Sequence, residues 1–447
     1  MQARISDSIW YSKADLRELP FLRATLTVRS KFGGDPIEIF NETSEEFGVP
    51  RYFKIPDKCL SPNINLEWSD CRALGTPTAL KFVGTPRDYQ EPVLAEMQES
   101  YFAHKRDSCI LNLETGAGKT CLAIHTICTL GTTALVIVPK SDLIEQWRDA
   151  LLEFTSIQPN EIGTVQQDTC EYEGKKVVIG MVHSICKDKY PQAFKDYFGL
   201  LVIDECHRSA APTFSQICKM FPAKYRLGVS ATVARQDGLD IIFRLHLGRT
   251  EIKLQGSTQP IPKVLVFKYA GFSGMVPKYL RDVTHKKAGL MTLLAENQDR
   301  NEKIAHMAFQ LANGGRQTAI LSERKKMLGG IRKVLIETYH MPPKKVGVYI
   351  SATPKTEKAR IVKECDIILA TTKMLNEGTD IPTLRALILA TPLTDPTQPA
   401  GRIRRRLEGV KEPIIIDILD TKYPESKRWY KSREKWYREK NCEINIL

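Results

Sequence analysis

The sequence predicts an α/β protein in which two parallel-sheet domains follow a small β-rich N-terminal domain. Short apolar runs alternate with helical patterns from about residue 85, and a second series of this kind begins near residue 291. Such alternation is typical of parallel sheets. At 447 residues, the chain is long enough for two or three domains. We therefore predict an N-terminal domain at 1–84, a first α/β domain at 85–250, a connector at 251–290, and a second α/β domain at 291–447 that ends in a basic helix.

The composition is that of a soluble globular protein. Charged residues make up 26% of the chain and hydrophobic residues 42%. No apolar run approaches the roughly 20 residues that span a bilayer, and the N-terminus has no apolar segment of the signal-peptide kind. The 11 cysteines include no C-x-x-C pair, which favours reduced thiols over a zinc ribbon or an iron–sulfur cluster. We expect a cytoplasmic protein that does not bind membranes.

Positive charge is concentrated in the second half of the chain. The net charge is +13, yet residues 1–84 are neutral, with 11 basic and 11 acidic side chains. Residues 321–363 carry 11 basic and 3 acidic side chains, and residues 421–447 carry 8 and 4. An excess confined to one half favours a surface that binds a polyanion. A solvated, lysine-rich face is the simpler explanation of any single run.

Residues 1–84 mix β-favouring runs with turn residues. The alternation over residues 22–28 predicts a strand, and residues 31–36 favour a turn. Residues 37–40 predict a second strand, and residues 51–54 a third. The segment contains no catalytic constellation, so we expect a small separate domain.

The stretch Thr115-Gly-Ala-Gly-Lys-Thr120 lies between an apolar run and a helical pattern. Glycines there let backbone N–H groups surround phosphate oxygens, and the helix that follows directs its positive end at them. We predict that Lys119 reaches the β- and γ-phosphates of ATP and that the hydroxyl of Thr120 binds Mg²⁺. Position 113, where the common pattern has glycine, is Leu. The predicted ATP contacts in this loop are Thr115, Gly116, Ala117, Gly118, Lys119 and Thr120.

An acidic motif completes the predicted nucleotide site. The apolar run at 200–203 predicts a buried strand that ends in Asp204 and Glu205. We predict that Asp204 holds Mg²⁺ and that Glu205 orients the water that attacks the γ-phosphate. The first domain also has predicted helices at 91–103 and from 141 onward, and predicted strands at 134–139, 177–180 and 225–230.

The second half repeats the architecture without a second phosphate loop. One strand, at 263–267, falls in the predicted connector. Because only the first series carries the loop, we expect the nucleotide between the two α/β domains. The predicted strands of the second domain are 318–321, 346–350, 366–370, 386–390 and 413–417.

Three motifs carry a family resemblance. Asp204-Glu-Cys-His207, Ser230-Ala-Thr232 and Gln398-Pro-Ala-Gly-Arg-Ile-Arg-Arg405 resemble motifs II, III and VI of superfamily-2 helicases, in order and in spacing. The resemblance covers about 85–410 and implies two RecA-like domains. The stretches at 227–238 and 432–437 look like those of XPB-like and phage UvsW-like DNA helicases. The UvsW-like group implies ATP-driven branch migration in DNA replication, recombination and repair, in host cytoplasm if the protein is phage-encoded.

The resemblance also implies roles for residues at matching positions. Adenine recognition falls to Arg87 and Gln90, and further nucleotide contacts fall to Gly378 and Asp380. Coupling of hydrolysis to strand movement falls to His207, Ser230 and Thr232. Catalytic roles fall to Gln398 and to the arginine fingers Arg402 and Arg405. Contacts with the DNA backbone fall to Pro139, Lys140, Ser322, Thr372 and Arg404.

Several of these residues have a simpler structural explanation. An ordinary helix N-cap accounts for Ser322 as well as a phosphate contact does. His207 could be a satisfied histidine of the cleft. The aromatic pairs at 429–430 and 436–437 are explained more simply as an apolar stripe than as a base-stacking surface, and Trp147 as a packing residue.

We therefore expect an ATP-dependent DNA helicase or translocase that acts on branched DNA. Because contacts with the backbone carry no sequence information, binding should be nonspecific in sequence and sensitive to salt. We expect a monomer, with residues 1–84 selecting the shape of the DNA. An RNA helicase remains an alternative, as does a translocating or binding subunit of a larger nucleic-acid-processing complex.

Overall fold

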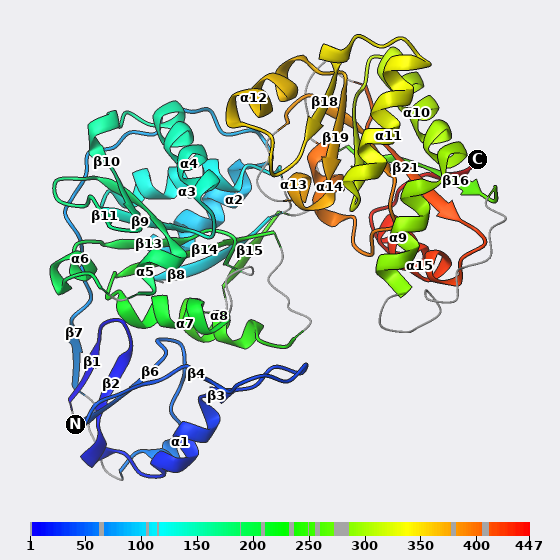
Figure 1. Cartoon of the computed structure of the whole chain (residues 1–447). Coiled ribbons are helices and arrows are strands. Elements are labelled where there is room, and N and C mark those ends of the chain that lie inside the picture. The colour runs from blue at the N-terminus through cyan, green and yellow to red at the C-terminus, as the bar shows by residue number, and fades with distance from the viewer. Residues whose placement is uncertain are drawn as a thin grey trace. The chain divides into compact units, whose positions relative to one another are not determined.

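The chain forms two compact units, Met1–Gly256 and Ser257–Leu447 (Figure 1). The computed structural model describes residues 2–61, 67–103, 107–113, 116–187, 189–206, 211–231, 237–248, 250–254, 260–271, 286–376, 381–404 and 411–447. Within these ranges, none of the helices combines the length and the apolar character that a membrane span requires. The two RecA-like parallel sheets and the small N-terminal sheet confirm the predicted fold class.

The first unit begins with a five-stranded sheet of order β5-β6-β2-β1-β7. A helix, α1, and a short hairpin, β3–β4, follow β2 (Figure 1). The bounds are β1 (Gln2–Ile5), β2 (Ile9–Ser12), α1 (Leu19–Thr25), β3 (Thr27–Val28), β4 (Ile37–Glu38), β5 (Asn41–Glu42), β6 (Glu46–Val49) and β7 (Glu67–Asp70).

Of the strands predicted in this segment, the one at 51–54 is wrong, and the one at 22–28 is confirmed only at its last two residues, as β3. Most of the range 22–28 is helical, because Pro20 favours the first turn of a helix and the fully buried Leu22 and Leu26 lie four residues apart. The range 51–54 is a turn and a loop, in which the guanidinium of Arg51 is buried against backbone carbonyls. The predicted strand at 37–40 is confirmed at its first two residues as β4.

The first RecA-like sheet has eight strands in the order β11-β10-β12-β9-β13-β14-β8-β15. Every neighbouring pair is parallel except β10 and β11. The central strands are buried along their whole length, as expected of a sheet covered on both faces. The strands are β8 (Ser108–Asn112), β9 (Ala134–Val138), β10 (Ile162–Gln166), β11 (Thr169–Cys170), β12 (Val177–Met181), β13 (Leu200–Ile203), β14 (Tyr225–Ser230) and β15 (Glu251–Lys253).

Helices cover both faces of this sheet (Figure 1). Side chains of α2, α3 and α4 fill the core on one face. Side chains of α5, α6, α7 and α8 fill the core on the other face. The helices are α2 (Glu91–Gln98), α3 (Lys119–Leu130), α4 (Ser141–Phe154), α5 (Val182–Ile185), α6 (Gln192–Asp196), α7 (Ala211–Met220) and α8 (Asp240–Leu247).

The N-terminal sheet shares its core with the second of these faces. One continuous cluster of buried apolar side chains runs from Ala3 to Leu247. Two buried arginines link the N-terminal sheet to the first RecA-like sheet. Arg51 donates to the carbonyls of Ser6 (2.6 Å) and Pro222 (3.1 Å). Arg226, on β14, donates to the carbonyl of Asp7 at 2.7 Å. The segment we expected to be separate is therefore packed into the first unit.

The second unit holds a seven-stranded sheet of order β18-β19-β17-β20-β21-β16-β22, in which all pairs are parallel. The five strands predicted from the sequence are confirmed, and the strand predicted in the connector is β16, inside this sheet. The strands are β16 (Lys263–Tyr269), β17 (Gln317–Ser322), β18 (Val346–Tyr349), β19 (Ile367–Thr371), β20 (Leu384–Leu389), β21 (Ile414–Asp420) and β22 (Ile444–Ile446).

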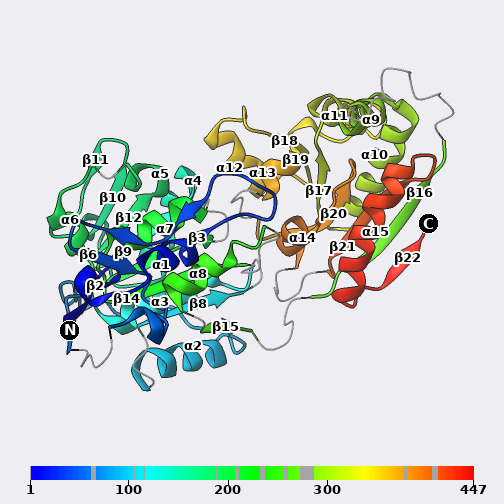
Figure 2. The ribbon, with the colours of Figure 1, turned by 90° about the horizontal axis from the view of Figure 1, so that it is seen from below.

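Helices α9, α10 and α11 cover one face of this sheet, and α12 to α15 cover the other. Figure 2 shows the last helix, α15, alongside β21. The helices are α9 (Lys286–Glu296), α10 (Gln298–Asn313), α11 (Lys325–Glu337), α12 (Lys355–Glu364), α13 (Thr372–Asn376), α14 (Thr397–Ile403) and α15 (Pro424–Glu439).

The C-terminal aromatic residues anchor α15. Tyr437 is fully buried and donates to Asp417 at 2.8 Å, and Arg433 forms a bidentate pair with the same carboxylate. Trp436 is buried, and Trp429 and Tyr430 are partly buried against the core. These contacts favour the apolar stripe over a base-stacking surface.

Candidate active site

Four parallel strands of the first unit end at one edge of the sheet. Ser230, the last residue of β14, pairs with Asn112 at the end of β8. Ile203, at the end of β13, pairs with Gly228 and Ile137 on its two sides. The carboxyl edge of a parallel sheet is where such folds bind ligands. The structure therefore gathers the glycine loop, the Asp204–Glu205 pair, Ser230 and the Pro139–Lys140 turn at this edge.

In the described part of the glycine loop, residues 116–120, the backbone is the one that the sequence predicts. Gly116 and Gly118 take positive φ values of 88° and 83°, a region that suits glycine, and α3 begins directly at Lys119. The ammonium of Lys119 lies 3.2 Å from the carbonyl oxygen of Leu113, so its side chain folds back across the loop. The two glycines and the N-terminus of α3, rather than the present position of the Lys119 ammonium, are what suit this segment to hold phosphate groups.

Leu113 occupies the position at which the common loop pattern has glycine. Its side chain is 1% exposed and belongs to the apolar core beneath the loop. Its N–H donates to the carbonyl of Ser230 at 3.0 Å, which ties the start of the loop to β14. A large residue at position 113 is therefore a packing residue.

Gln90 supports the loop from the side. The residue is 3% exposed, its Nε2 donates to the carbonyl of Ala117 at 3.0 Å, and its Oε1 accepts from the N–H of Arg87 at 2.9 Å. The guanidinium of Arg87 donates to the hydroxyl of Tyr89 at 2.9 Å. The Nε2 end of the Gln90 amide thus braces the loop, and its Oε1 end is held by Arg87. Adenine recognition by Arg87 and Gln90 stays a prediction.

The carboxylate of Asp204 is held at both oxygens. Oδ1 accepts the N–H of Glu205 at 2.8 Å, and Oδ2 accepts the indole N–H of Trp147 at 2.9 Å. Burial and the nearby charge of Glu205 raise the pKa of Asp204 to about 6, against the opposing effects of Trp147 and Lys119. Glu205 has a φ of 47°, a conformation rare outside glycine that collects at functional sites.

The oxygen atoms at this edge suit Mg²⁺. The carboxylates of Asp204 and Glu205 follow β13, and the hydroxyl of Thr120 lies in the first turn of α3. Hard oxygen ligands of this kind are what Mg²⁺ prefers, usually with water and phosphate oxygens completing the shell. The residues present therefore fit the predicted metal.

Ser230 is fully buried at the end of β14 and contacts the thiol of Cys206. Burial raises the pKa of that thiol to about 12, so Cys206 stays a neutral packing residue. The contact joins β14 to the segment after Asp204, and the coupling role of Ser230 stays a prediction.

In the second unit, Gln398 and Arg402 lie on α14, four residues apart and therefore on one side of the helix. Both are partly buried. Thr372 begins α13, directly after β19. The structure places these three residues on short helices that follow strands of the parallel sheet.

Two predicted DNA contacts are engaged inside the second unit. Arg404 is 2% exposed, and its Nε donates to the carbonyl of Pro260 at 3.2 Å. Ser322 is fully buried, and its hydroxyl accepts the N–H of Arg324 at 3.0 Å. Both geometries favour structural roles, namely holding the chain before β16 and closing the turn before α11.

Six of the predicted site residues lie outside the described ranges, and their roles stay predictions. They are Thr115, His207, Thr232, Gly378, Asp380 and Arg405.

The sequence interpretation missed one residue of the site. Trp147 lies in an ordinary amphipathic pattern on α4, where it is most simply a packing residue. Its indole N–H is the feature that reaches Asp204, 57 positions away in sequence. Only the general tendency of buried tryptophan to find a hydrogen-bond acceptor could have suggested such a role.

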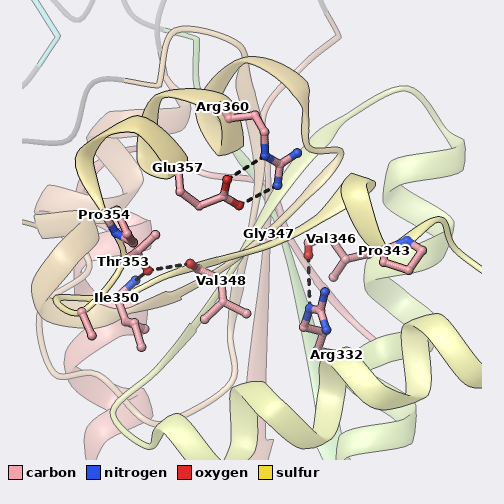
Figure 3. A pocket seen from close by; sticks show the side chains of 11 residues that line it. Arg332, Pro343, Val346, Gly347, Val348, Ile350, Thr353, Pro354, Glu357 and Arg360 are labelled. Carbon is pink, nitrogen blue, oxygen red and sulfur yellow. Dashed lines mark hydrogen bonds and ion pairs between the residues drawn. The ribbon is translucent and has the colours of Figure 1, made fainter.

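A separate cavity of about 360 Å³ lies along β18, an edge strand of the second unit (Figure 3). Arg332 donates to the carbonyl of Val346 at 3.3 Å, and Thr353 donates to that of Val348 at 2.9 Å. These side chains occupy edge carbonyls that could otherwise pair with another strand. None of the predicted site residues that the structure describes lines this cavity.

The chain is similar in sequence to several known proteins. The family described as "Type III restriction enzyme, res subunit" matches residues 84–235. The "Putative ATP-dependent RNA helicase L396" of Acanthamoeba polyphaga mimivirus is 28% identical over 442 residues, covering 97% of this chain and 82% of that protein. The "Probable helicase D10" of Escherichia phage T5 is 24% identical, covering 80% and 78%.

Among solved structures, S. cerevisiae Dbp5 bound to RNA and ADP BeF3 matches with a TM-score of 0.54 at 15% identity. The match covers 82% of this chain and 90% of that one. At this identity the likeness speaks for the fold alone, with two RecA-like sheets in one chain.

Proposed function

We propose that this chain, a helicase of the superfamily-2 type and so an ATP-hydrolysing enzyme, uses ATP hydrolysis to move along DNA and to remodel branched DNA. The proposed substrates are forks and Holliday junctions. The observation that carries this proposal is the Asp204–Glu205 pair on the same sheet edge as the Lys119 loop. We propose a monomer that works in the cytoplasm of a host cell, in keeping with the phage and viral relatives.

For the nucleotide, we assign the N–H groups of the glycine loop and Lys119 to the phosphates. Asp204 and Thr120 would hold Mg²⁺, which supplies positive charge to the phosphate oxygens. Glu205 orients the attacking water and takes up its proton. Gln398 and Arg402 act on the γ-phosphate. The guanidinium of Arg402 can donate two parallel hydrogen bonds to phosphate oxygens, and it keeps its positive charge because it does not lose its proton.

For the nucleic acid, we assign the backbone contacts to Pro139, Lys140 and Thr372. Lys140 precedes the first residue of α4, and Thr372 is the first residue of α13. The N–H groups of Lys140 and Thr372 can bind phosphate oxygens without reading bases, whereas Pro139, which has no N–H, can contribute only packing against the DNA backbone. We therefore expect affinity that falls steeply with salt and varies little with sequence.

DNA is favoured over RNA by two positions of the resemblance. Motif II ends in Cys206-His207 where RNA helicases of the superfamily commonly have Ala-Asp, and motif VI begins with Gln398 in place of His. The alternative, an RNA helicase, is supported by the mimivirus relative, which is named as a putative ATP-dependent RNA helicase. ATP turnover stimulated by matched branched DNA and structured RNA separates the two, and a clear preference for RNA would overturn our choice.

We propose that residues 1–84 select the shape of the DNA. The β3–β4 hairpin ends in Phe32, which is 75% exposed, beside Lys31, whose N–H donates to the carbonyl of Asp237 at 3.0 Å. An exposed aromatic ring among basic side chains can stack on a base at a junction. Phe32→Ala should impair junction unwinding more than ATP turnover.

The central experiment is the Lys119→Ala variant. It should lose ATP hydrolysis while keeping DNA affinity, because Lys119 contacts phosphate in this proposal and the assigned DNA contacts lie elsewhere. Lys81→Ala, an exposed lysine outside the loop, is the matched control. Substantial DNA-stimulated hydrolysis by Lys119→Ala would contradict the proposed site.

A further inference from the structure

Trp147 makes a contact that packing alone does not require. Its side chain is 1% exposed and lies on α4 between two other buried residues, Ile144 and Leu151. The indole N–H donates to Asp204 Oδ2 at 2.9 Å. A buried indole usually finds an acceptor, but here the acceptor is the carboxylate assigned to the metal.

The geometry fixes the carboxylate in one orientation. The N–H of Glu205 holds Oδ1 at 2.8 Å, and Trp147 holds Oδ2. Each oxygen of an ionised carboxylate has a second lone pair, so both can still face a cation or a bound water. The two donors therefore restrict rotation of the side chain without using up its capacity to bind a cation.

The packing of α4 fixes the position of the indole. Helix α4 packs against α3, β9 and β12, and its buried side chains belong to the core on that face. The same helix starts at Ser141, directly after the Pro139–Lys140 turn. A shift of α4 at its start would thus reach Asp204 through a rigid aromatic side chain.

We propose that Trp147 is a positioning residue, through which α4 holds the carboxylate of Asp204 in the orientation that binds Mg²⁺. The inference rests on the proposed role of Asp204. It adds that the turn assigned to DNA and the carboxylate assigned to the metal are joined by one helix and one hydrogen bond.

The test is the Trp147→Phe variant, which keeps an aromatic ring in the core and removes the N–H. The readout is the dissociation constant of ADP, measured by calorimetry once with Mg²⁺ and once with a chelator. Partners that orient a metal ligand typically contribute about 10- to 100-fold in metal affinity or activity. We expect Trp147→Phe to weaken the Mg²⁺-dependent part of ADP affinity by that factor and to leave the Mg²⁺-free affinity unchanged.

Leu151→Val is the matched control, because it disturbs the packing of α4 one turn away from Trp147 without removing a hydrogen bond to Asp204. It should leave the Mg²⁺-dependent part unchanged. If Trp147→Phe behaves like Leu151→Val in this measurement, the inference is wrong and Trp147 is only a packing residue.

Asp204→Asn separates this result from the proposed function. If Asp204→Asn retains full Mg²⁺-dependent ADP affinity and ATP turnover, the assignment of Asp204 fails, whatever Trp147 does. If Asp204→Asn loses both and Trp147→Phe loses neither, only the positioning role fails. A raised Mg²⁺ requirement for turnover in Trp147→Phe, met by adding excess Mg²⁺, would support that role.

Discussion

Gly118 and Gln90 fit together so closely that a Cβ at position 118 would require the Gln90 amide to move. A Cβ added at Gly118 would lie 2.1 Å from Gln90 Nε2, and the backbone φ of 83° is strained for any other residue. The same amide donates to the carbonyl of Ala117 at 3.0 Å. The glycine thus serves the packing of Gln90 against the loop as well as the approach of phosphate.

Gly118→Ala should therefore damage the nucleotide site more than the backbone strain alone predicts. The strain of a positive φ costs about 1–3 kcal/mol, and the displaced Gln90 amide would shift the loop. We expect ATP turnover to fall by about 100-fold, since displacements near 1 Å cost that much in positioned reactions.

Gly174→Ala is the control for this variant. Gly174 has a similar φ of 69° with open space around its Cβ position, so it carries the strain without the contact. A Gln90→Ala/Gly118→Ala double variant should recover part of the stability lost in Gly118→Ala. Equal effects of Gly118→Ala and Gly174→Ala on turnover would rule out the contact as the cause.

Removal of residues 1–84 should destabilise the first unit. The deletion would expose the apolar side chains of α7 and α8 that pack against the N-terminal sheet, and it would remove the Asp7 carbonyl that accepts from Arg226. We expect the truncated protein to aggregate or to unfold at a clearly lower temperature. Thermal unfolding and binding of a hydrophobic dye would measure this.

A truncated protein that melts like the full chain would contradict the shared core. The outcome also matters for function, because a deletion that unfolds the first unit cannot report on substrate choice. The surface variant Phe32→Ala is the cleaner test, since its ring is exposed and outside the core.

The sequence predicted the parts of the site that are local. Buried parallel strands appear as continuous apolar runs, so β8, β9, β13 and β14 were recognisable, as were the loop and the carboxylates at their ends. These residues are specified by their neighbours in sequence.

The rest depends on contacts between distant residues. Gln90 meets Ala117 across 27 positions, and Arg226 meets Asp7 across 219. Nothing in the sequence around Arg226 indicates that its side chain links two sheets. The strand predicted over 22–28 failed over most of its length for the opposite reason, because a few alternating residues outweighed Pro20 and the helical spacing of Leu22 and Leu26.

The first unit should lose stability as the pH falls below about 6.5, the ordinary pKa of histidine in an unfolded chain. His246 on α8 is fully buried, and burial together with the charges of Arg226, Lys219 and Arg51 holds its pKa well below that value. Its Nε2 lies 3.1 Å from the hydroxyl of Ser215. The folded state keeps the ring neutral while the unfolded state takes up a proton.

Below pH 6.5 the unfolded chain binds more protons than the folded chain, so acid favours unfolding, by at most about 1.4 kcal/mol per pH unit for one group. Urea unfolding of the first unit at a series of pH values would measure the slope. His246→Gln should flatten the slope between pH 7 and the acid limit, whatever it does to the midpoint at neutral pH. An unchanged slope in that variant would assign the acid sensitivity to other groups.

Arg402 and Arg404 are two residues apart at the end of α14, yet the structure predicts different roles for them. Arg402 is partly buried on the side of the helix that also carries Gln398, whereas Arg404 is 2% exposed and donates to the carbonyl of Pro260. Arg402→Gln should lower ATP turnover with little effect on folding. An arginine finger contributes about 10³–10⁵ in comparable enzymes, which sets the range to expect.

Arg404→Gln should instead lower the unfolding temperature of the second unit. It removes a buried donor and leaves the Pro260 carbonyl unsatisfied, at a cost of about 1–3 kcal/mol. The ATP turnover of each folded Arg404→Gln molecule should be closer to that of the unmodified protein than the turnover of Arg402→Gln is. Each variant thus serves as the control for the other, because both remove one guanidinium from the same basic segment. If Arg404→Gln abolished turnover or DNA binding without changing the melting curve, its buried contact would be incidental and the DNA role predicted from the sequence would return.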